Sequence, residues 1–118
     1  MSRRKIKKRR RKCPRNYDSH HILHYRRLWD YGFKSLLRRS FIYELPIEVH
    51  HDLHTVVGPV PPLEEAEARQ LWYDLKAVDH DMDLYEGLEW LIDNAPNNKF
   101  AAAITAQYVF LQENLGRS

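Results

Sequence analysis

Histidine is concentrated in two short segments, and the chain is organised around them. Six of the seven histidines lie in or beside these segments, namely His20, His21, His24, His50, His51 and His54. His50 and His54 are four positions apart, so on a helix their side chains project from one face and can hold one ion between them. Neutral imidazole is the commonest metal ligand among side chains. The spacing therefore favours a metal site, with His51 about 100° away round the helix.

Length and cysteine content limit the class of protein. A chain of 118 residues is at most one domain with a tail. The single cysteine, Cys13, excludes an internal disulfide and a cysteine-rich zinc module, and it favours a reducing compartment. No apolar run approaches the length of a membrane span, and no secretory apolar region follows the basic start. We therefore expect a cytoplasmic protein without a membrane partner.

Charge is distributed in three blocks. Residues 1–15 carry ten basic and no acidic side chains, residues 16–58 carry five of each, and residues 59–118 carry four basic and eleven acidic ones. The ten basic residues of the first block are Arg3, Arg4, Lys5, Lys7, Lys8, Arg9, Arg10, Arg11, Lys12 and Arg15. Such a block behaves as a disordered arm that neutralises phosphates, which makes nucleic acid the expected partner, DNA rather than RNA. A solubility tail or an electrostatic address is the alternative.

The patterns after the basic arm predict a short extended segment followed by a helix. Residues 17–19 have turn-forming character, and the flanks of residues 20–24 suggest a strand or an extended entry segment. From Tyr25 to Arg39 the apolar side chains recur at helical spacing.

A strand and a short helix are predicted next. Residues 40–45 are rich in β-branched and aromatic side chains, and Pro46 ends this strand. The helix that follows runs from Ile47 to Thr55 or Val57 and carries three histidines. Residues 58–62 form a stiff, extended, proline-rich connector.

Three further helices are predicted in the acidic half. The first begins near Pro62, the second begins with a capping box at Asp83 and Glu86, and Asn97 or Asn98 caps the third. Their apolar stripes are, in order, Ala68, Leu71, Trp72, Leu75 and Val78; Leu84, Leu88, Leu91 and Ile92; and Phe100, Ala103, Ile104, Tyr108, Leu111 and Leu115. None carries a chemical constellation, and His80 between two aspartates is most simply a surface loop residue. We assign these helices to scaffold or to binding a protein partner.

The two histidine groups, joined by a strand, resemble the HNH, or His-Me finger, nucleases, in particular the colicin-type branch. There a tandem His-His begins a β-hairpin, and a helix that follows the second strand and a proline ends in a His-x-x-x-His pair. This sequence offers His20-His21, the strand 41–45, Pro46 and His50-x-x-x-His54. The resemblance covers residues 18–57, about a third of the chain.

The resemblance implies a role for each of four histidines. His20, His50 and His54 would bind one divalent ion, and His21 would be the general base for the attacking water. A cation beside the scissile phosphate stabilises the developing charge, and an imidazole that ionises near neutral pH can deprotonate water. Successive side chains of a strand point to opposite sides, so one histidine can bind metal while its neighbour faces substrate. Three imidazoles suit Zn²⁺, Ni²⁺ or Mn²⁺ better than Mg²⁺. The carboxylates near enough in sequence to orient these rings are Asp18, Glu44, Glu48 and Asp52.

The sequence departs from the family pattern in its missing asparagine, in a largely helical segment where the family has a loop and strand, and in its lack of paired CxxC zinc knuckles. The family usually has an asparagine between the two histidine groups, and residues 22–49 contain none. Three functions therefore stay open. They are a metal-dependent endonuclease, an accessory protein that binds nucleic acid through a degenerate finger without cutting it, and a protein-interaction module of viral or mobile-element origin.

We expect an α+β fold that is mostly helical. Residues 1–15 form the basic arm, residues 16–58 form an HNH-like strand and helix unit, and residues 59–118 form acidic helices that pack on this unit within a single globular domain.

Overall fold

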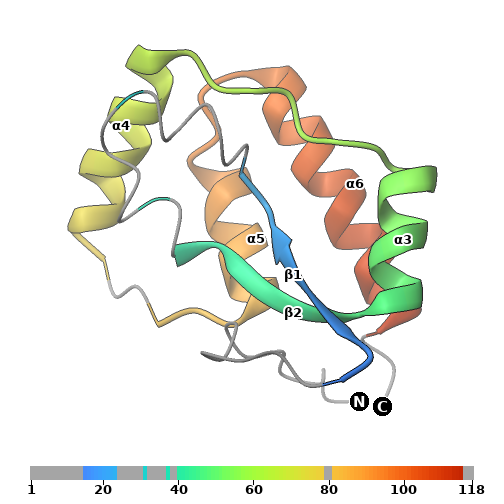
Figure 1. Ribbon diagram of the computed structural model, residues 1–118. Helices are drawn as coiled ribbons and strands as arrows, with labels where there is room; N and C mark the ends of the chain where they lie inside the picture. The colour runs from blue at the N-terminus through green and yellow to red at the C-terminus, as the bar shows by residue number, and fades with distance from the viewer. Residues whose placement is uncertain (1–14, 24–30, 32–36, 38–39, 79–80, 116–118) are drawn as a thin grey trace.

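The computed structural model has the expected α+β architecture, in which helices predominate over a two-stranded sheet (Figure 1). It describes residues 15–23, 31, 37, 40–78 and 81–115. The elements in chain order are β1 (Tyr17–His21), β2 (Ile42–Pro46), α3 (Ile47–Val56), α4 (Glu65–Lys76), α5 (Leu84–Asp93) and α6 (Asn98–Asn114).

The strands β1 and β2 pair antiparallel, with His20 opposite Tyr43 and His21 opposite Ile42. The prediction for β1 was wrong in its boundaries, because residues 17–19 belong to the strand and not to a turn. The turn lies one position earlier, at Asn16, whose φ of 71° is left-handed. These residues adopt the strand conformation, despite their turn-forming side chains, because pairing with β2 satisfies their backbone N–H and C=O groups.

The helix α3 follows β2 without a loop, as the sequence predicted. Pro46 is its N-cap residue, so the missing proline N–H falls where the helix has no intrahelical acceptor. At the other end, Gly58 has a φ of +83° and donates its N–H to the carbonyl oxygen of Leu53 at 3.2 Å. This left-handed residue ends the helix and turns the chain into the extended connector.

The three acidic helices form with the caps that the sequence indicated, apart from one start. Asp83 and Glu86 make the reciprocal capping box of α5, and the Asn97 side chain accepts from the amide of Phe100 at the start of α6. The helix α4 begins at Glu65, later than the predicted Pro62, because Glu64 forms its own capping box with Glu67.

The core lies between the sheet and the helices. The buried side chains include Tyr43 and Leu45 from β2, Leu53 from α3, and apolar residues of α4, α5 and α6. The helix α6 packs against both α5 and α3 (Figure 1). The helix α3 also contacts both strands, so it packs against the sheet as well as against α6.

Tyr43 ties β2 to α5 through a close contact with Gly87. The Tyr43 hydroxyl lies 3.0 Å from the carbonyl oxygen of Met82, and a Cβ atom placed on Gly87 would lie 2.5 Å from that hydroxyl. We therefore expect Gly87→Ala to lower the free energy of unfolding by about 1–3 kcal/mol, although alanine by itself favours a helix by about 1 kcal/mol. Urea unfolding measures the change.

A double-mutant comparison identifies the cause of this loss. Tyr43→Phe removes the hydroxyl and leaves the ring carbon, which would lie 3.3 Å from the new Cβ. The alanine should then cost less in the Tyr43→Phe background than in the wild type. A Gly87→Ala protein as stable as the wild type would contradict the predicted clash.

Several predictions fall outside the described residues. They concern the basic arm except Arg15, His24, most of the helix expected over residues 25–39, and His80. Arg15 itself is exposed in the turn that precedes β1. Within the part of the chain that the structure describes, no helix is both long and apolar enough to cross a membrane.

Candidate metal centre

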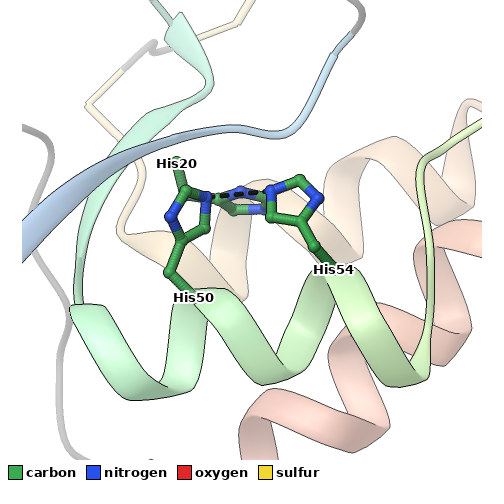
Figure 2. A group of neighbouring side chains, drawn as sticks. All are labelled: His20, His50 and His54. Carbon is green, nitrogen blue, oxygen red and sulfur yellow. Dashed lines mark hydrogen bonds between the residues drawn. The ribbon is translucent and has the colours of Figure 1, made fainter.

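Three of the predicted site residues come together in the fold. His20 from β1 meets His50 and His54 from α3, and one ring nitrogen of each lies within 4.8 Å of the others (Figure 2). The ring centroids are 5.2 Å apart for His20 and His50, 5.9 Å for His20 and His54, and 4.6 Å for His50 and His54. Two nitrogens bound to one tetrahedral zinc ion lie about 3.3 Å apart. A small rearrangement of the three rings is therefore enough to hold a metal ion.

The strand places His20 and His21 on opposite sides, as expected for neighbours in β1. His20 is 2% exposed and faces the core, whereas His21 is exposed at the end of the strand. Asp18, two residues before His20, lies on the same side of the strand as His20. The structure thus separates one buried histidine that joins the group of three from one exposed histidine that does not.

The helix α3 presents His50 and His54 one turn apart, and their Nε2 atoms are 3.0 Å from each other. The Nδ1 atom of His50 lies 3.2 Å from a carboxylate oxygen of Asp18. A carboxylate can only accept here, so the His50 Nδ1–H donates and its Nε2 keeps a lone pair for a metal. Asp18, one of the four carboxylates considered from sequence, therefore orients a candidate ligand ring. Glu48 and Asp52 are exposed on α3.

Sequence analysis missed one residue of the site, Gln107 of α6. Its Oε1 atom lies 3.0 Å from the Nε2 atom of His20, and both side chains are 2% exposed. Gln107 lies on the buried stripe of α6 between Ile104 and Leu111. A polar side chain at a core position of an amphipathic helix was the available signal, because such a group needs a buried hydrogen-bond partner.

Burial lowers the pKa of two candidate ligands, His20 and His54, which favours the neutral form of both rings. Removal from solvent lowers the pKa of His20 from 6.5 to about 4, with a smaller contribution from the nearby histidines, while the hydrogen bond that His20 makes to Gln107 raises it. Partial burial lowers the pKa of His54 as well, with smaller contributions from His50 and His51. A neutral imidazole is the form that binds a metal. The electrostatics of the group therefore suit metal binding at neutral pH.

His51 lies outside the group, as its position round the helix predicted. Its side chain is exposed on α3. Among the described residues, the group close enough to hold a metal ion consists of His20, His50 and His54, which are the three residues that the resemblance implied as ligands.

Comparison of the chain with protein-family models, with curated proteins and with solved structures gives no significant match.

Proposed function

We propose that the protein is a metal-dependent endonuclease that hydrolyses phosphodiester bonds in nucleic acid. The observation that carries the proposal is the convergence of His20 with His50 and His54 on a strand, strand and helix unit. The order of these elements, with a tandem histidine on the first strand, also supports the resemblance to colicin-type HNH nucleases. A cytoplasmic location would give such an enzyme access to DNA.

The residues divide into a binding set and a reacting residue. His20, His50 and His54 would hold one divalent cation, which would stabilise the charge that develops on the phosphate and on the leaving oxygen. Asp18 keeps the His50 ring in the orientation that a ligand needs. His21 is exposed and directly follows His20 in the sequence, and it would take a proton from the attacking water. The basic residues between Arg3 and Arg15 would hold the nucleic acid through its phosphates.

Zinc is the metal that the donor set favours. All three candidate ligands are imidazoles, and zinc sites with three protein ligands keep a fourth position open for catalysis. Nickel and manganese also accept imidazole ligands, whereas magnesium prefers oxygen. The metal that gives the highest rate therefore tests the donor set as well as the activity.

The proposal is tested by nicking of supercoiled plasmid. We expect the purified protein to convert the plasmid to open circles with Zn²⁺, Ni²⁺ or Mn²⁺, more slowly with Mg²⁺, and not at all with EDTA. His54→Ala should abolish the metal-dependent cleavage because it removes a ligand, while His51→Ala, a change at an exposed histidine of the same helix, should preserve it. Cleavage that survives EDTA, or none with any of these metals, would overturn the nuclease proposal.

A binding protein without catalytic activity is the second candidate. It is favoured by the basic block in residues 1–15 together with the lack of asparagine in residues 22–49. Such a protein would bind DNA with an affinity that falls steeply with salt and is unchanged by EDTA or by His21→Ala. When plasmid cleavage is absent, a gel-shift titration at two salt concentrations, with and without EDTA, tests this second candidate, and no DNA binding would overturn it.

A further inference from the structure

The two ring nitrogens of His20 have different surroundings. Nε2 lies 3.0 Å from Gln107 Oε1, whereas Nδ1 is buried and has no hydrogen-bond partner among the residues that the structure describes. A buried polar atom without a partner is costly, and native proteins rarely keep one without a reason. The buried Nδ1 atom of His20 therefore calls for a partner that the described side chains do not supply.

The contact with Gln107 determines which tautomer His20 adopts. An amide oxygen accepts hydrogen bonds and cannot donate them, so the proton of the neutral ring is on Nε2. Nδ1 then carries a lone pair, which is the form of nitrogen that binds a metal ion. A metal between His20, His50 and His54 would supply the partner that this lone pair lacks.

We propose that Gln107 is a positioning residue of the metal centre, which fixes the Nε2–H tautomer of His20 so that His20 binds metal through Nδ1. This inference rests on the proposed function and extends it, because it makes α6 a part of the centre. Asp18 and Gln107 then play parallel roles. Asp18 accepts from His50 Nδ1 and leaves Nε2 for the metal, and Gln107 accepts from His20 Nε2 and leaves Nδ1.

Three variants separate positioning from packing. Gln107→Met keeps the length of the side chain and removes the oxygen, whereas Gln107→Glu keeps an acceptor at the same reach. Gln112→Met makes the same change at an exposed position of α6. Circular dichroism in EDTA shows which variants fold. Zinc affinity is then measured by competition with a coloured chelator, and long-range ¹H–¹⁵N NMR of the histidine rings gives the tautomer of His20.

We expect the wild-type protein to show the Nε2–H tautomer in EDTA and to shift the His20 Nδ1 resonance on zinc addition. Gln107→Met should bind zinc about 10–100-fold more weakly and show a mixture of tautomers. Gln107→Glu and Gln112→Met should stay within a few-fold of the wild type. Folded Gln107→Met with wild-type zinc affinity, or zinc bound to His20 Nε2, would overturn the role of Gln107 alone. A wild-type protein that binds none of the metals would overturn the metal centre itself.

Discussion

We expect His21→Ala to retain metal binding and to lose phosphodiester cleavage, with a rate about 10²–10⁴-fold below that of the wild type. His21 is exposed at the end of β1 and lies outside the three-histidine group, so its removal leaves all three candidate ligands in place. The loss would then come from the missing base for the attacking water. Plasmid nicking under single-turnover conditions measures the rate, and zinc competition measures the affinity.

Two other histidine variants serve as controls for His21→Ala. His51→Ala removes another exposed histidine and should change neither quantity, whereas His54→Ala should lower both because His54 belongs to the group. A His21→Ala protein that cleaves at the wild-type rate would assign the base to another residue. A His21→Ala protein that no longer binds zinc would instead place His21 among the ligands.

The second large effect concerns the metal-free protein in acid. Burial lowers the pKa of His20 from 6.5 to about 4, so between these values the unfolded chain binds a proton that the folded chain does not. The stability that His20 contributes is complete above pH 6.5 and is lost as the pH falls toward 4. We expect the free energy of unfolding in EDTA to fall by about 2 kcal/mol from pH 7.5 to pH 5. The lowered pKa of His54 acts in the same direction.

Urea unfolding in EDTA at a series of pH values measures this dependence. His20→Leu removes the titrating ring from the buried position, so its stability should change less over the same range, whatever its absolute value. His51→Gln alters an exposed ring of α3 that makes a smaller contribution through His54, so it should change the slope much less than His20→Leu does. An unchanged slope in His20→Leu would show that other groups cause the loss.

Local chemistry explains which parts of the fold could be predicted from sequence. The capping box at Asp83 and Glu86, the cap at Asn97, and the i, i+4 spacing of His50 and His54 depend on neighbours within one turn. The boundaries of β1 depend on pairing with β2, which lies far along the chain, and the turn-forming side chains of residues 17–19 pointed the other way. Tertiary pairing decided the outcome there.

The candidate site shows the same division. His20, His50 and His54 were predicted as ligands from a resemblance, and the fold brings them together. Gln107 was not predicted, because a single glutamine on a helix gives no indication of the partner that its amide will meet 87 positions away. Such a partner follows only from how α6 packs on α3, which contacts β1 in turn and so brings Gln107 to His20.

His20 and Gln107, which form a hydrogen bond in the folded protein, are made at different times during synthesis because they are 87 positions apart. Ribosomes add about 5–20 residues per second. The 87 positions between the two residues therefore take about 4–17 s to translate, and His50 and His54 are made within the first half of that interval. A growing chain carries its three histidines before it carries the glutamine that orients the first of them. The centre described here is therefore completed only after α6 has left the ribosome.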